Sequence, residues 1–341
     1  MCLTVARQLL VMAIIVVISF FFSKKNRFDK KESQYLSRIL LYVINPCMIV
    51  STFDVEFSGQ KLKALGLAVA VSFAFHLAMI GIASLLFARK KAESQNFLQG
   101  QKAGRSEDCS QDQNSLQDQT AGRDSLSKIA IVFTNSGFIG IPLINGVFGG
   151  EGVFYLMGYI LVFNILLWIW GEWLMTGTMR PLKILANPNV LACAAGLAVF
   201  CLPFKIPYVI IEPLKMIGAC NGAVSMILLG LLFASFDAAA EWKLYAKPLA
   251  RDVFLRLLVC PLFLLFATLF ALRSFAFAGE IHLIMSVLFI AAACPVGMSV
   301  SSFAVVFKKD ADYASLLVAV SSAACIATIP ILVALLELFL R

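Results

Sequence analysis

Ten long apolar stretches constrain the fold of this chain more than any other feature. A helix needs about 20 apolar residues to cross the hydrocarbon core of a bilayer. Hydrophobic residues make up 60% of the chain and charged residues 14%, whereas ordinary soluble domains are roughly 45–50% apolar. We therefore predict an all-α polytopic membrane protein with ten transmembrane helices. The stretches cover residues 3–22, 35–53, 62–87, 127–148, 153–176, 188–204, 208–235, 248–272, 281–307 and 313–339.

The distribution of Lys and Arg predicts the orientation of these helices, because the two residue types concentrate on cytoplasmic loops. The loops after the odd-numbered stretches contain 20 of them, and the opposite side contains 7. We therefore expect both termini to face outward from the cell membrane, whether plasma or inner membrane, and the polar loop 88–126 to be cytoplasmic. The net charge of +8 follows from this topology, so binding to nucleic acid is not expected.

The ten predicted helices divide into two repeats of five, residues 1–177 and 178–341. Because five is odd, the second repeat starts on the opposite side of the membrane, and the two repeats have inverted topology. Residues 88–126 form the one long polar insertion and are rich in Gln, Ser, Asp and Gly. Such a composition buries too little apolar area to fold alone, so we expect this loop to be disordered.

Polar residues, glycines and prolines interrupt the fourth and ninth stretches at the same place. The first interruption reads TNSGFIGIP over residues 134–142, and the second reads CPVGMS over residues 294–299. Aligning the Val-Phe pairs that follow them puts Asn135 opposite Cys294. One such break is more often a packing feature, because Gly and Pro are frequent in membrane helices. Two matched breaks are typical of the binding site of a transporter.

The two broken helices are expected to cross in the protein interior, where buried groups or a wet cavity can satisfy the freed backbone. Half-helix N-termini there favour a bound anion, and the amide of Asn135 adds two hydrogen-bond donors. These neutral donors could bind a carboxylate even though the site contains no Lys or Arg. The predicted substrate-binding residues are Thr134, Asn135, Ser136, Gly137, Gly140, Pro142, Cys294, Pro295, Gly297 and Ser299, with Asn45 and Asn221 on the facing side.

His76, Arg256 and Glu172 lie within the stretches, where ionisable groups are functional candidates. His76 either relays protons for coupling or is a neutral group hydrogen-bonded between helices. Arg256 either meets a substrate carboxylate or a counter-charge, or it extends toward the cytoplasm, and we favour the last interpretation. Glu172 is expected at a solvated helix end. No metal spacing and no catalytic motif accompanies them, so we expect no cofactor, no metal and no enzyme activity.

These residues resemble the auxin efflux carrier family, within the wider group that includes bile-acid sodium symporters. The resemblance implies a scaffold of the first, second, sixth and seventh helices and a moving bundle of the third to fifth and eighth to tenth. It also implies that Asn135 occupies the family's substrate-binding Asn position. Two departures are Asn45 before Pro46, where an apolar residue is more usual, and Ala223-Val224, where members often carry a Pro. The matching motifs are NSGFIGIPL at 135–143, Asn187-Pro188, Leu228-Leu229-Gly230, Arg256-Leu257 with Pro261, and Cys294-Pro295.

The sequence thus predicts a secondary active transporter that moves a small organic anion, malate-like, malonate-like or auxin-like, by alternating access. One alternative is a sodium-coupled organic-anion symporter, with sodium bound by unwound carbonyls and hydroxyls. Another is a transporter-like sensor or scaffold whose loop 88–126 contacts a partner. The expected partners are the anion, a coupling ion that is a proton or sodium, the lipid bilayer and, as one option, a second copy of the chain in a homodimer.

Overall fold

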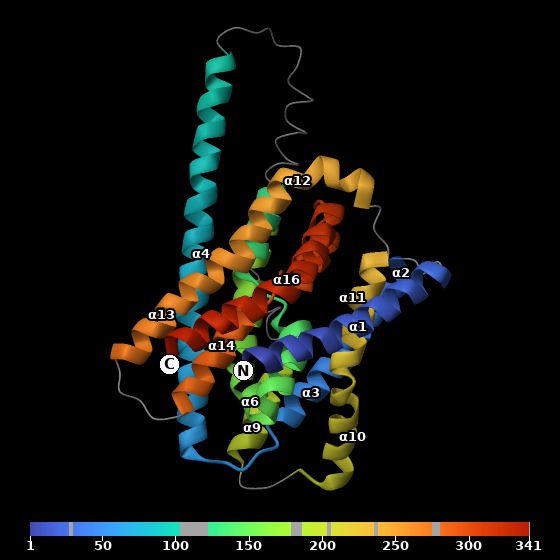
Figure 1. Cartoon of the computed structure of the whole chain (residues 1–341), viewed down its shortest axis with the longest axis vertical. Helices are drawn as coiled ribbons and strands as arrows, with labels where there is room; N and C mark the ends of the chain where they lie inside the picture. The colour runs from blue at the N-terminus through green and yellow to red at the C-terminus, as the bar shows by residue number, and fades with distance from the viewer. Residues whose placement is uncertain are drawn as a thin grey trace.

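The computed structural model describes residues 1–26, 30–102, 122–178, 186–202, 206–234, 238–274 and 280–340. Their regular structure is helical (Figure 1), and β pairing among them is limited to one bridge within the breaks. The first part holds α1 (Cys2–Asn26), α2 (Lys30–Ile39), η1 (Leu40–Ile44), α3 (Asn45–Thr52), α4 (Gly59–Lys102), a helix over 122–132, η3 (Ser136–Gly140), α6 (Ile141–Leu166), η4 (Leu167–Gly171) and α7 (Glu172–Thr176). The second holds α9 (Pro188–Cys201), α10 (Tyr208–Ala219), α11 (Asn221–Ala234), α12 (Ala238–Phe254), η5 (Leu255–Val259), α13 (Cys260–Ser274), α14 (Glu280–Ala293), α15 (Met298–Val306) and α16 (Ala311–Leu340).

Within the described residues, 7 helices are long and apolar enough to cross a bilayer. Four of the predicted stretches explain the difference from ten. Residues 127–148 and 153–176 contribute to one run, Ser136–Thr176, which is kinked where Gly149 has φ 66° and ψ −161°. Residues 281–307 are divided by the break after Ala293, and 188–204 form the short helix α9. These apolar helices identify the chain as a multi-pass membrane protein, and the count of ten helices stays a prediction.

Prolines explain three of the four π-helical turns in the described residues. The turns η1, η3 and η5 each end two residues before a proline, namely Pro46, Pro142 and Pro261. A proline lacks the backbone N–H and its ring clashes with the carbonyl four residues earlier, which here lies inside the turn. Widening the turn relieves this clash while the helix continues.

The helix α14 runs through the core of the molecule. All residues from 287 to 294 are 0–2% exposed, as expected for a helix that is apolar on every face. It packs against α4, α6, α13 and α16. On another side of the molecule α1 lies along α11, and α3 packs between α9 and α10. Between residues 8 and 22 the exposed side chains of α1 are apolar, among them Leu10, Ile14 and Ile18, which suits contact with lipid.

A polar cluster anchors the start of the 122–132 helix, which leads into the first break. Arg123 forms an ion pair of 2.8 Å with Asp310, at the start of α16. The Tyr245 hydroxyl donates to the same carboxylate at 3.1 Å, and the Tyr313 hydroxyl donates to buried Asp252 at 2.6 Å. The 122–132 helix is thereby fixed to α12 and α16 at the end opposite the break.

The polar loop differs from the expectation of disorder over part of its length. The helix α4 continues without interruption to Lys102 and projects beyond the other helices in Figure 1. Residues 88–102 are rich in Lys, Gln and Ala, which are good helix formers and extend a helix once it has begun. Residues 103–121 of the loop lie outside the described residues, and residues 122–126 begin the next helix.

The two chain ends lie at the same end of the helices. The N-terminal ammonium of Met1 pairs with Glu337 of α16 at 2.8 Å, and Figure 1 shows both termini close together. An even number of crossings places both termini on one side of a membrane.

We predict that Gly230→Ala lowers the thermal unfolding midpoint of the purified protein, because α11 lies too close to α1 for a side chain at this position. A Cβ there would stand 2.5 Å from the carbonyl oxygen of Val16 and 2.9 Å from the backbone nitrogen of Phe20. Overpacking of this kind costs about 1–3 kcal/mol. Gly81→Ala is the matched control, since its Cβ would meet nothing within 4 Å. Equal midpoints for the two variants would contradict the packing of α1 on α11.

Candidate functional site

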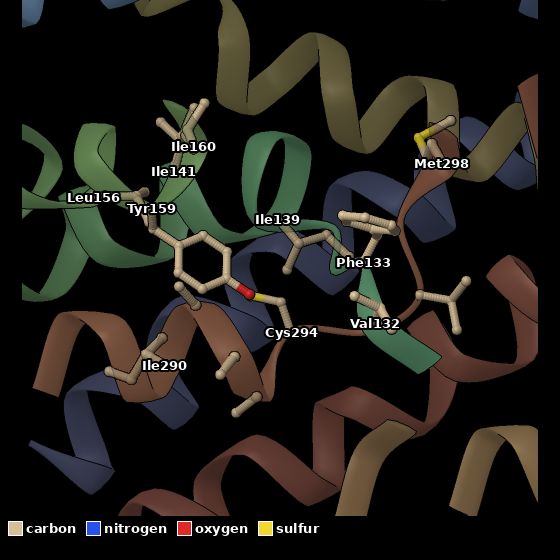
Figure 2. Close-up of a cluster of buried hydrophobic side chains, with 14 of the residues drawn as sticks. Val132, Phe133, Ile139, Ile141, Leu156, Tyr159, Ile160, Ile290, Cys294 and Met298 are labelled. Carbon is tan, nitrogen blue, oxygen red and sulfur yellow. The ribbon is translucent and has the colours of Figure 1, made fainter. Parts of the chain in front are cut away.

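The two predicted breaks lie side by side and complete each other's backbone hydrogen bonds. The amide of Asn135 donates to the carbonyl of Pro295 at 2.8 Å, and the amide of Gly297 donates to the carbonyl of Phe133 at 3.0 Å. The antiparallel bridge joins Thr134 to Val296. Figure 2 shows the first segment at Val132 and Phe133 and the second from Cys294 to Met298. Because hydrocarbon offers no partners to unwound backbone, each break depends on the other.

Four helix ends meet at these breaks. The 122–132 helix and α14 end there, while η3 and α15 begin there. Neither helix start is capped by a side chain: the N-cap residue Asn135 forms no capping bond, and the N-cap residue Gly297 has no side chain. Helix starts carry partial positive charge and helix ends partial negative charge. The arrangement therefore brings two positive and two negative half-helix ends to one place in the core.

A cavity of about 130 Å³ adjoins the starts of η3 and α15. Asn45 and Asn164 contribute amides to its wall, and Trp168 and Phe303 contribute aromatic rings. No charged side chain lines it among the described residues. The full lining is Ser37, Leu41, Asn45, Ile49, Thr134, Asn135, Ser136, Gly137, Phe138, Ile141, Ile160, Phe163, Asn164, Leu167, Trp168, Asn187, Asn189, Gly297, Met298, Ser299, Ser302 and Phe303.

Three hydrogen-bond donors of this wall are buried and have no partner among the described residues: Nδ2 of Asn135 and the hydroxyls of Ser136 and Ser299. Asn135 is 4% exposed and Ser136 1%. A buried polar group without a partner costs about 1–3 kcal/mol, which a ligand can repay by accepting hydrogen bonds. Since all three belong to the two breaks, the cavity suits a ligand rich in acceptor oxygens.

The structure brings seven of the twelve predicted binding residues to the cavity: Asn45, Thr134, Asn135, Ser136, Gly137, Gly297 and Ser299. Five lie behind it. Asn221 donates its amide to Oδ1 of Asn45 at 2.6 Å, and the carbonyl of Pro295 is the acceptor for Asn135. These two residues hold cavity-lining residues in position.

The other three pack around the breaks. A Cβ on Gly140 would stand 3.3 Å from the sulfur of Cys294, and Figure 2 shows the hydroxyl of Tyr159 beside that sulfur. Pro142 lies against Gly222 of α11, whose Cβ would be 3.1 Å from the proline ring. Cys294 is fully buried. These contacts close the apolar side of the break.

His76 and Arg256 lie outside the cavity wall. Nδ1 of His76 is 2.7 Å from the carbonyl of Ser72 on the same helix, so this nitrogen carries the proton. Its Nε2 has no partner among the described residues, and the ring lies 4.7 Å from that of Tyr159 between centroids. The histidine therefore packs within the bundle through an intrahelical bond rather than bridging two helices by hydrogen bonds.

Two expectations for charged residues are wrong. Arg256 does not extend toward the cytoplasm, because it is fully buried and its guanidinium donates to backbone carbonyls. Glu172 is 1% exposed rather than solvated. The neighbouring Gly171 lies close to Phe303 and Ile129, so α15 and the 122–132 helix cover this part of the chain.

Sequence reasoning did not assign a binding role to several polar residues of the wall. Asn164 lies in the middle of an apolar stretch and donates to the carbonyl of Ile160 at 2.8 Å. An amide at membrane depth is the signal that could have found it. Asn187 caps α9, accepting from the amides of Asn189 and Val190 at 2.9 and 3.2 Å. An Asn before a proline predicts only the start of a helix. The sequence therefore did not predict that Asn187 lines the cavity.

A second cavity, of about 370 Å³, continues from the first. The two share Ser37, Leu41, Met298 and Ser302. The second cavity reaches the starting ends of α2 and α16, and Arg38 is the only basic residue that lines it among the described residues. The two cavities together extend from the breaks to one end of the bundle, where Arg38 and Asp312 both line the second cavity.

Comparison with known proteins bears on the part of the chain that contains the second break. Residues 173–333 match the model of a family described as membrane transport protein. The match supports a membrane transporter, and the family is not one of enzymes. It spans α9 to α15 with Arg256 and agrees over this part with the resemblance to auxin efflux carriers. A transporter of this kind implies a small-molecule substrate and a lipid bilayer. A search of curated proteins found no match.

We predict that Gly297→Ala destabilises the protein while Gly137→Ala does not. A Cβ at 297 would stand 2.9 Å from the carbonyl oxygen of Thr134 and would force the paired breaks apart, whereas a Cβ at 137 meets nothing within 4 Å. Thermal unfolding of both variants in detergent checks this. A Gly297→Ala protein as stable as wild type would contradict the close pairing of the breaks.

Proposed function

We propose that this protein is a secondary transporter that moves a small organic anion by alternating access. The observation that carries the proposal is the group of three buried, unpartnered donors on Asn135, Ser136 and Ser299. They stand where two half-helices begin, and such starts attract anions through their amides and dipoles. A carboxylate offers several acceptor lone pairs to neutral donors. The substrate would bind against these residues.

The volume of the cavity favours a small acid. At about 130 Å³ it is close to the ~150 Å³ cavity that encloses a benzene molecule. Malonate or malate has a comparable size, whereas an indole acid adds a second ring to its carboxylate. We therefore favour a short carboxylate over an auxin-like acid as the substrate.

The architecture proposed for transport is ten helices in two inverted repeats, residues 1–177 and 178–341, with the broken helices crossing. The contacts of α1 with α11 and of α3 with α9 and α10 support a scaffold of the first, second, sixth and seventh helices. The contacts of α14 with α4, α6, α13 and α16 support a moving bundle, which meets the scaffold where α1 packs against α6 and α16. The proposed orientation has the termini outside and the loop 88–126 inside.

In this orientation the second cavity opens toward the cytoplasm. Its far end lies near the start of α2 and near Lys308 and Lys309, before α16. Substrate would exchange with the cytoplasm past Arg38 and the serines shared with the central cavity.

We expect Asn135→Ala to reduce uptake of labelled malonate or malate at least about tenfold, because one lost hydrogen bond to a charged group is worth about 1.5–3 kcal/mol. Uptake is measured in proteoliposomes under imposed pH, sodium and voltage gradients. Thr268→Ala is the matched control: it also removes a buried polar group without a partner among the described residues, from α13 outside the cavity. Undiminished uptake by Asn135→Ala would remove the site assignment, and no wild-type flux for any acid would refute the proposed substrate class.

We expect Arg38→Gln to raise the KM for the anion from the cytoplasmic side with little change in kcat. An exposed cation at the mouth of a cavity increases the local anion concentration, and salt screens this effect over about 10 Å at 0.1 M. The KM difference from wild type should therefore shrink at high ionic strength. A salt-independent loss of kcat would instead show that Arg38 acts structurally.

A further inference from the structure

Arg256 joins the ends of the two broken helices. Its guanidinium donates to the carbonyl of Ile131 at 2.8 Å and to that of Cys294 at 3.2 Å, and also to the carbonyl of Ala292. Ile131 lies in the last turn of the 122–132 helix, and the other two acceptors lie at the end of α14. The arginine itself belongs to η5 and is fully buried.

These carbonyls would otherwise form a cation site. The last carbonyls of a helix have no partner within that helix and carry the negative end of its dipole. Where two such ends meet inside a membrane, they are suited to bind sodium or another coupling cation. Arg256 forms no ion pair with a carboxylate among the described residues, and its fixed charge faces these carbonyls instead.

We propose that the guanidinium of Arg256 occupies the place that a coupling sodium ion would take between the two half-helix ends, so that the breaks need no bound metal cation. One consequence of this inference, that anion uptake does not require sodium, rests on the proposed transport function. The local arrangement is independent of the substrate. It separates the charges at the breaks, with helix starts facing the cavity and helix ends facing Arg256.

Arginine suits this position better than lysine would. The guanidinium carries five N–H donors in a planar fork, so one side chain can reach carbonyls of both helices at once. An ammonium is a more compact point charge on a flexible stem. Arg256→Lys therefore keeps the charge but loses part of the connection between the helices.

The first experiment measures the thermal unfolding midpoint of the purified, substrate-free protein in sodium, potassium or choline chloride at equal ionic strength. We expect the wild-type midpoint to be the same in all three salts. Arg256→Ala should unfold at least about 5 °C lower, and sodium or guanidinium should restore part of this loss while choline should not. Arg7→Ala, which removes an exposed arginine, should show neither effect.

A wild-type midpoint raised specifically by sodium would overturn the inference, as would an Arg256→Ala protein that no small cation stabilises. If Arg256→Ala does not fold, Arg256→Lys decides the question. It should fold with a lower midpoint that sodium leaves unchanged, and a sodium-dependent midpoint would contradict the proposal.

The second experiment compares malonate uptake by wild-type proteoliposomes in sodium and in choline. Equal rates are expected, and uptake that saturates with sodium would overturn the inference. If the wild type moves none of the acids tested, the proposed function fails, whereas the thermal measurement still decides what Arg256 does.

Discussion

The requirement that every backbone polar group inside a membrane find a partner governs this structure. Two interrupted helices would each be costly alone, since their unwound residues would face hydrocarbon. Here the interruptions satisfy each other, with Asn135 bonded to Pro295 and Gly297 bonded to Phe133. The carbonyls that remain at the helix ends are met by Arg256. Because these bonds link the two halves of the chain, neither half can form its break independently.

The same arrangement separates the positive and negative ends of the helix dipoles. The positive starts of η3 and α15 face a cavity with unpartnered donors, and the negative ends of the 122–132 helix and α14 face a buried cation. Neutral groups can then attract an anion without a lysine or arginine in the cavity wall. In the proposed transport cycle this matters, because a full charge in the wall would hold the anion strongly and slow its release on the other side of the membrane.

Prolines place the irregular turns of the structure beside the breaks and the cavity. Pro46 follows a π turn close to Asn45 in the cavity wall, and Pro142 follows the π turn at the first break. Pro261 follows the π turn that carries Arg256. Each proline prevents a regular helix at a position where a polar side chain must point inward. The irregular turns therefore belong to the site rather than to the general packing.

The sequence by itself determined the membrane class, the two breaks and the polar residues Asn135, Ser136 and Ser299, because apolar length and Gly/Pro/Asn patterns are local properties of a chain. It could not decide which residues from distant segments share a cavity. Asn164 and Asn187 read as isolated polar residues, and only packing brings them beside the breaks. Tertiary structure also reversed the interpretations of Arg256 and Glu172. Whether a charged side chain in a membrane helix extends to water or stays buried depends on the partners that other helices present, and one helix's sequence does not contain that information.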